Sequence, residues 1–135
     1  MRAVCLLLLT LTLPVSAAPV PRELRGGDDV RIVGVWRLEK ARYGDGEYAG
    51  AVGTKWTLGA EGQAIRERPN EALGTVVYKI YPKAAAKTFD WDGGSFPGVY
   101  ELDGDTLRVA LGGSVRPESC KPGEGVYFFE FRKVR

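Results

Sequence analysis

Five acidic residues lie close together between residues 90 and 109. They are Asp90, Asp92, Glu101, Asp103 and Asp105. Clustered carboxylates can bind a metal ion or supply an acid and a base for catalysis. The residues between them favour another interpretation, because acidic and apolar residues alternate here and alternation along a strand sends the two sets to opposite faces. We therefore expect these carboxylates on a solvated face and in turns.

Weak calcium binding and a catalytic carboxylate pair are the alternatives. An Asp-x-Asp-Gly sequence begins at Asp90, as in a calcium-binding loop, but the alternating ligands that should come next are missing. Asp103-Gly104 is typical of a tight hairpin, since glycine adopts the positive φ that such a turn needs. The expected site has no metal and no cofactor.

The chain contains no histidine. This removes the commonest general base, the usual serine or cysteine triad and most zinc sites. Carboxylates and lysines could still act as catalysts, but no spacing among them favours it. We expect a protein that is not an enzyme, with an enzyme as the third choice behind two kinds of binding protein.

Two further groups of residues could carry chemistry. Cys120 lies in the loop SVRPESCKPGEG beside Arg116 and Lys121, and nearby cations can lower a thiol pKa. Without a histidine we expect an inert thiol, with an intermolecular disulfide or a nucleophile as alternatives. Arg66 and Arg68, separated by Glu67, are expected on an outward strand face, because anion binding would need a larger patch of one sign.

The first 18 residues have the order of a secretory signal peptide: Arg2, an apolar run and a small-residue cleavage site. The run is too short for a transmembrane helix, which needs about 20 apolar residues. Residues 19–29 are expected to form a linker and residues 30–135 one domain. The charge is nearly balanced, with 19 basic and 17 acidic residues, whereas a protein that binds nucleic acid usually has an excess of basic residues. We expect a secreted or periplasmic protein with no membrane span after cleavage.

A period of two, in short runs separated by turn residues, predicts strands along the whole domain. We expect them at residues 32–43, 54–58, 63–68, 75–81, 87–91, 98–102, 106–111 and 126–134. The connections are short, so consecutive strands should pair antiparallel. The expected fold class is all-β, an antiparallel up-and-down β-barrel of about eight strands, since closure removes exposed strand edges.

Gly34-Val35-Trp36 matches the Gly-x-Trp signature of lipocalin-like barrels. With GVYELDGDTLRVAL, RPESCKPGEG and the closing VYFFEFRKVR, the chain resembles a lipocalin-like domain family abundant in exported proteins of planctomycete bacteria. The resemblance covers nearly all of residues 30–135 and implies the barrel and export, but no activity. It also implies a cation on the last strand against Trp36. Arg132 and Lys133 both qualify, and alternation gives the inward position to Lys133.

The inward aromatic residues either fill the barrel or line a cavity open at one end. If a cavity exists, we expect it to bind a small apolar or amphipathic ligand through Trp91 and Tyr100, with Trp56 and Tyr78. This end lies opposite Trp36. The alternative is a filled barrel whose outer face contacts another cell-envelope protein. Both hypotheses stay open at this point.

Overall fold

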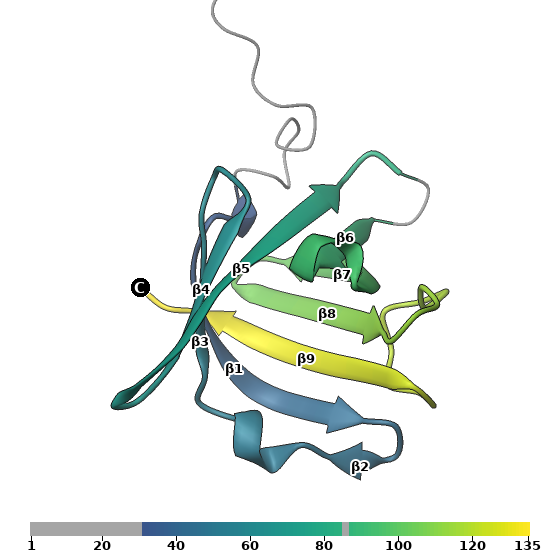
Figure 1. The fold of residues 1–135 in the computed structure, drawn as a ribbon, viewed down its shortest axis with the longest axis horizontal. Helices are drawn as coiled ribbons and strands as arrows, with labels where there is room; N and C mark the ends of the chain where they lie inside the picture. The colour runs from purple at the N-terminus through teal and green to yellow at the C-terminus, as the bar shows by residue number, and fades with distance from the viewer. Residues whose placement is uncertain (1–30, 85–86) are drawn as a thin grey trace, which may run out of the picture.

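The computed structural model of the protein describes residues 31–84 and 87–135. The expected signal peptide and linker, residues 1–18 and 19–29, lie outside the described residues. Within the described part, strands joined by short turns make up most of the chain (Figure 1). The alternating pattern of the sequence therefore dominates the fold, as expected for strands with one buried face.

Nine strands occur in the described residues. They are β1 (Gly34–Tyr43), β2 (Gly46–Glu47), β3 (Lys55–Leu58), β4 (Gln63–Arg68), β5 (Glu71–Tyr81), β6 (Thr88–Trp91), β7 (Phe96–Asp103), β8 (Thr106–Gly112) and β9 (Val126–Lys133). Two single-turn helices interrupt them, η2 (Ala49–Ala51) and η3 (Asp92–Gly94). Eight of the strands correspond to the expected ones, and only the two-residue β2 has no counterpart in the prediction.

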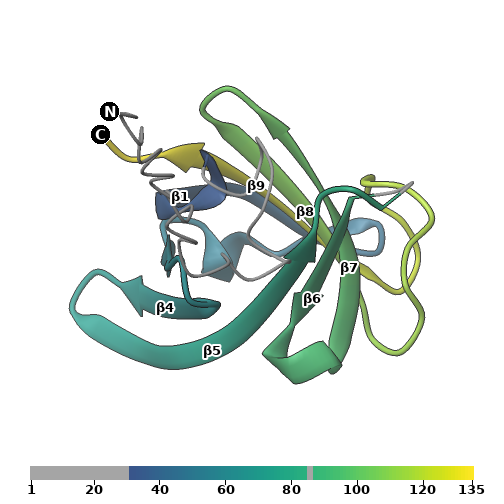
Figure 2. The same ribbon diagram turned by 90° about the horizontal axis from the view of Figure 1, so that it is seen from above.

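The strands form one closed antiparallel sheet. Their order is β2-β1-β3-β4-β5-β6-β7-β8-β9, and β1 also pairs with β9, so eight strands close the barrel while β2 pairs with β1 alone. Seen from above, the strands surround a common interior (Figure 2). The predicted all-β up-and-down barrel is confirmed.

The strand boundaries differ from expectation mainly at β5, which begins at Glu71 rather than at residue 75. The reason is the tight β4–β5 hairpin, in which Arg68 pairs with Glu71. Asn70 adopts a φ of 65° there, and asparagine tolerates this left-handed conformation better than most residues. Pairing therefore continues to the hairpin tip.

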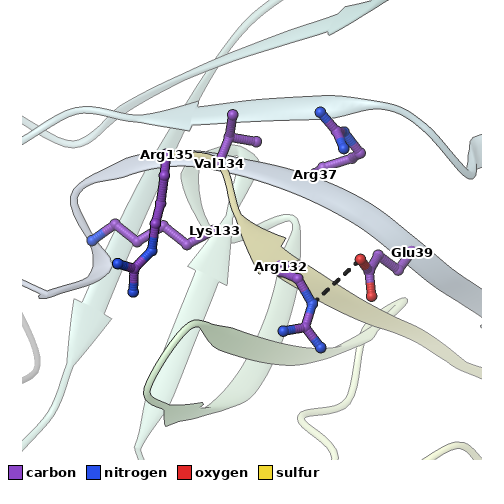
Figure 3. A pocket seen from close by; sticks show the side chains of 6 residues that line it. All are labelled: Arg37, Glu39, Arg132, Lys133, Val134 and Arg135. Carbon is purple, nitrogen blue, oxygen red and sulfur yellow. Dashed lines mark ion pairs between the residues drawn. The ribbon is translucent and has the colours of Figure 1, made fainter.

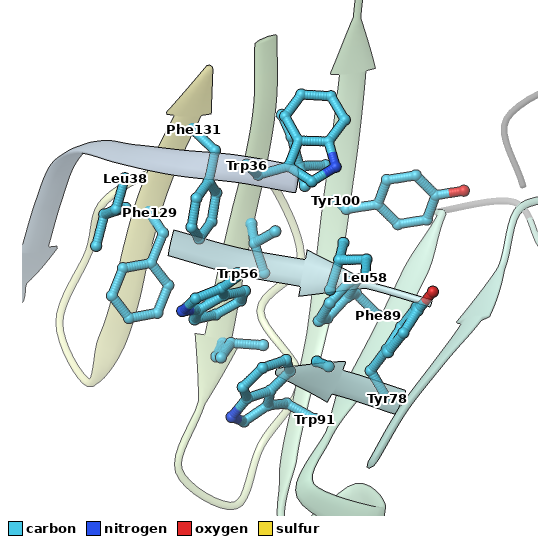
Figure 4. Close-up of a cluster of buried hydrophobic side chains, with 14 of the residues drawn as sticks. Trp36, Leu38, Trp56, Leu58, Tyr78, Phe89, Trp91, Tyr100, Phe129 and Phe131 are labelled. Atoms are coloured by element: carbon cyan, nitrogen blue, oxygen red, sulfur yellow. The ribbon is translucent and has the colours of Figure 1, made fainter. Parts of the chain in front are cut away.

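The barrel interior is filled by alternate residues of its strands (Figure 4). The largest fully buried side chains are Trp36, Tyr100, Phe89, Phe131, Ile32, Leu38, Leu58, Ile80, Leu107 and Val109. Most belong to the inward sets that alternation predicts. Burial of such large side chains is the main stabilising contribution, about 25 cal/mol per Å² of apolar surface.

The two ends of the barrel differ. At one end Trp36 pairs with Lys133, and we call it the Trp36 end. At the other end Tyr43 pairs with Tyr127, and we call it the Tyr43 end. The β4–β5 hairpin and η3 also lie at the Tyr43 end, because β4 and β6 both run toward it.

The connection between β8 and β9, residues 113–125, packs against the outside of the barrel and is called the strap here. Its Cys120 is buried with Val99, Ala110 and Phe128 in a second, smaller apolar cluster. Arg116 donates hydrogen bonds to the Asp90 carboxylate and to the Gly98 carbonyl, both at 2.7 Å. The strap therefore covers outward residues of β7, β8 and β9 that would otherwise be exposed.

Candidate functional site

The four residues expected to bind a ligand all lie inside the barrel. Trp56 is 5% exposed, Tyr78 2%, Trp91 6% and Tyr100 2%. The Trp56 and Trp91 rings stack at 4.2 Å between centroids, although β3 and β6 are not neighbours in the sheet. This stack spans the interior and fills its middle with ring atoms, so a ligand would not reach all four side chains at once.

These four residues do not form one wall. The Tyr78 hydroxyl turns toward the Trp36 end and donates to the Gly59 carbonyl at 2.5 Å. Phe89 lies between the other two rings, 6.0 Å from Trp91 and 6.2 Å from Tyr100 (Figure 4). Trp91 is consequently the member of the set nearest the Tyr43 end, while Tyr100 lies toward the Trp36 end.

The Trp36 end is closed by its own residues. The Trp36 ring is fully buried, and its indole nitrogen donates to the Ile32 carbonyl at 2.8 Å. The Lys133 ammonium lies 5.6 Å from the centroid of the Trp36 ring, a cation-π contact. Lys133 also approaches Gly34, where an added Cβ would meet its Cε at 3.2 Å. The glycine of the Gly-x-Trp signature thus leaves room for the lysine.

Arg132 takes the opposite direction. It points outward and forms an ion pair with Glu39, with 3.4 Å between nitrogen and oxygen. The pair belongs to a surface hollow of about 230 Å³, and Figure 3 shows the six residues that line it: Arg37, Glu39, Arg132, Lys133, Val134 and Arg135. The sequence left open whether Arg132 or Lys133 covers Trp36, and in the structure Lys133 does so.

At the Tyr43 end the aromatic packing continues to the surface. Tyr43 and Tyr127 lie 4.4 Å apart, and Phe96 is 6.3 Å from Tyr127. We call Tyr43, Phe96 and Tyr127 the aromatic rim. Phe129 links the rim to the core, 6.5 Å from Tyr127 and 5.5 Å from Trp56. Tyr43 remains 50% exposed, so apolar ring surface at this end is open to solvent.

The expectation that Arg66 lies on an outward face is wrong. Ala64, two residues earlier on β4, is fully buried, and alternation therefore turns Arg66 inward. Its guanidinium carbon lies 5.9 Å from the centroid of the Trp91 ring. The register shifts at Arg66/Glu67, so Arg68 leaves the barrel and approaches Glu71 at 4.0 Å. The small residue Ala64 was the sequence signal for this orientation.

The acidic residues of the opening segment lie outside the barrel or in turns. Asp90 pairs with Arg116 of the strap, Glu101 with Arg108 of the neighbouring strand, and Asp105 with Arg135. Glu101 stands at the twelfth position counted from Asp90, as in a calcium loop, but it belongs to β7 rather than to a loop. Among the described residues no group of three or more potential metal ligands occurs.

Cys120 is the free cysteine of the described residues, and it is buried. Burial, with a smaller contribution from the negative charge of Glu101, raises the pKa of its thiol to about 12. Arg108 acts in the opposite direction but does not compensate. The neutral thiol is the poorly nucleophilic form, which makes this side chain a packing residue of the strap.

Comparison with protein families, with curated proteins and with solved structures finds no match for this chain. Over residues 31–84 and 87–135, we find no helix with the length and apolar character needed to cross a bilayer. The two ends of the barrel therefore provide the evidence on function.

Proposed function

We propose that the protein is an exported, non-enzymatic binding module of lipocalin-like type. In this proposal it holds a small apolar or amphipathic ligand at the Tyr43 end of the barrel. The observation that carries it is the run of ring contacts from Trp91 and Trp56 through Phe129 to the half-exposed Tyr43. Aromatic surface left open at the end of a barrel favours a ligand that covers it.

The contrast between the two ends supports the location. At the Trp36 end the aromatic ring is fully buried, hydrogen-bonded and covered by Lys133. At the Tyr43 end Tyr43 is half exposed and Phe96 and Tyr127 are partly exposed, and covering their apolar surface would gain about 25 cal/mol per Å². A ligand therefore has more to gain at the Tyr43 end.

The ligand site that we propose is shallower than a deep barrel cavity. The stacked Trp56 and Trp91 rings form its floor, and the aromatic rim forms its wall. Trp91 keeps the role expected for it, and Trp56 contributes from below. Tyr78 and Tyr100 support the floor from the Trp36 side rather than contact the ligand.

A second candidate is a filled barrel that contacts another cell-envelope protein. It is favoured by Ile65 and Val77, which lie outward on β4 and β5 and are 50% and 57% exposed. In the β4–β5 register Ile65 faces Thr75, two residues from Val77, so the two apolar side chains are diagonal neighbours. They form a small patch, smaller than the surfaces that stable protein partners bury.

Fluorescence titration with the uncharged apolar probe N-phenyl-1-naphthylamine tests the proposal. We expect saturable binding to the wild type, weakened at least 10-fold in Tyr127→Ala and Trp91→Ala. Trp36→Phe, at the opposite end, is the matched control and should bind as the wild type does. Native mass spectrometry of protein purified from its own envelope would identify a ligand that copurifies. The absence of saturable probe binding would contradict the proposal and favour the protein-partner candidate.

A further inference from the structure

We infer that Arg66 recognises the anionic group of the ligand, and that the ligand is an amphipathic carboxylate with a flat apolar body. This inference rests on the proposed function and adds the chemical class of the ligand. It starts from the finding that Arg66 points into the barrel at the end where the aromatic rim is exposed.

Four neighbours hold Arg66 in place. On β3 it pairs with Trp56, and on β5 with Gly74. An added Cβ at Gly74 would meet no atom within 4 Å, so space remains beside the arginine on this side. The guanidinium lies over Trp91, and its Nη2 donates to the Leu73 carbonyl at 3.3 Å. Together these contacts hold a charged group over the Trp91 ring, the core tryptophan nearest the Tyr43 end.

The hydrogen-bonding capacity of this guanidinium is mostly unused. Its Nε is buried without a hydrogen-bond partner, and among the described residues no carboxylate lies within ion-pair distance of it. Five arginines outside the barrel interior do have acidic partners: Arg68, Arg108, Arg116, Arg132 and Arg135. A guanidinium stays charged at every physiological pH and offers five N–H donors. A buried donor without a partner is costly, and an anion supplied from outside would remove that cost.

The geometry of the surrounding rings indicates the rest of the ligand. A carboxylate matches the guanidinium fork with two parallel hydrogen bonds. The Trp91 ring beneath it is stacked on Trp56 with an interplanar angle of 13°, so the floor of the site is flat. In this inference an aromatic or otherwise planar apolar group packs against the half-exposed aromatic rim beside this stack while its carboxylate meets Arg66.

Two ligands of equal size but different charge test the inference. We choose 2-naphthoate and 2-naphthalenemethanol, and measure each affinity by calorimetry. The wild type should bind the carboxylate at least 10-fold more tightly than the alcohol. In Arg66→Gln this preference should fall to near unity, through loss of carboxylate affinity alone. Arg68→Gln, two residues along the same strand but outside the barrel, should keep the wild-type preference.

The outcomes separate this inference from the proposed function. Equal affinities of the wild type for both ligands would overturn the role of Arg66 and leave the binding module standing. Binding of neither ligand would overturn both. A preference unchanged in Arg66→Gln, with a near-ultraviolet dichroism spectrum like that of the wild type, would also contradict the inference. Arg66→Lys should restore part of the preference, because it keeps the charge but loses the planar fork.

Discussion

One cation lies over a tryptophan ring at each end of the barrel. The two cations differ in how far their hydrogen-bond donors have partners in the protein. Lys133 covers Trp36 and also donates to the Arg31 carbonyl at 3.4 Å. Arg66 lies over Trp91 with a buried nitrogen that has no partner. The Lys133–Trp36 contact closes the Trp36 end of the barrel. The Arg66–Trp91 contact leaves a hydrogen-bond donor of Arg66 for the ligand that we propose.

Trp36→Ala tests the closing contact. We expect a loss of roughly 3 to 5 kcal/mol in the free energy of unfolding, because a large aromatic residue leaves a cavity when it is truncated. Urea denaturation followed by circular dichroism measures it. Probe binding by the remaining folded protein should be unchanged. A loss below about 1 kcal/mol would show that Trp36 does not hold this end together.

The Cys120 thiol gives a prediction on pH. Its pKa is raised to about 12, so the folded protein keeps the thiol neutral while the unfolded chain ionises it near its ordinary pKa of about 8.5. Keeping the thiol neutral costs the folded protein nothing below the pKa of the unfolded chain. Above that pKa the unfolded chain gains from ionisation, so the free energy of unfolding falls as the pH rises toward 12. The urea midpoint of the wild type should therefore fall more between pH 8 and pH 10.5 than that of Cys120→Ala. Parallel declines in the two proteins would contradict the assignment.

At the scale of elements, alternation predicted eight strands and most inward residues, because each strand has one face in the core. The charge of Arg66 favours an outward position, but alternation from the buried Ala64 turns it inward. Tyr43, Phe96 and Tyr127 follow the same alternation, but nothing in the sequence reveals that Tyr43 stays half exposed. The packing of the strap depends on contacts distant in sequence, such as Arg116 with Gly98, which local patterns do not encode.

Two adjacent glycines test the attachment of the strap. A Cβ added at Gly112 would collide with the Val115 carbonyl, whereas one added at Gly113 would meet nothing within 4 Å. We expect Gly112→Ala to destabilise the protein by about 1 to 3 kcal/mol through overpacking, and Gly113→Ala to change stability far less. Thermal unfolding of both variants measures the difference. Equal melting temperatures would show that the start of the strap adapts freely.

For the whole molecule, export is part of the proposed function, and the signal peptide predicted at the N-terminus is its basis. The predicted signal peptide gives a direct test. N-terminal sequencing of protein recovered from the envelope or medium should begin at Ala18 or Pro19, after the small residues that signal peptidases prefer. Recovery of an exported form that still starts at Met1 would refute cleavage.

Ligand binding at the Tyr43 end can be followed through the indole N–H signals of the three tryptophans in a ¹H–¹⁵N correlation spectrum. Trp36 closes one end and Trp91 lies nearest the other, while Trp56 pairs with Trp36 in the sheet and its ring stacks on Trp91. During titration with 2-naphthalenemethanol, the Trp91 and Trp56 signals should move saturably and the Trp36 signal should stay fixed. Movement of the Trp36 signal alone, or three signals that do not respond to the ligand, would show that no ligand binds at the Tyr43 end.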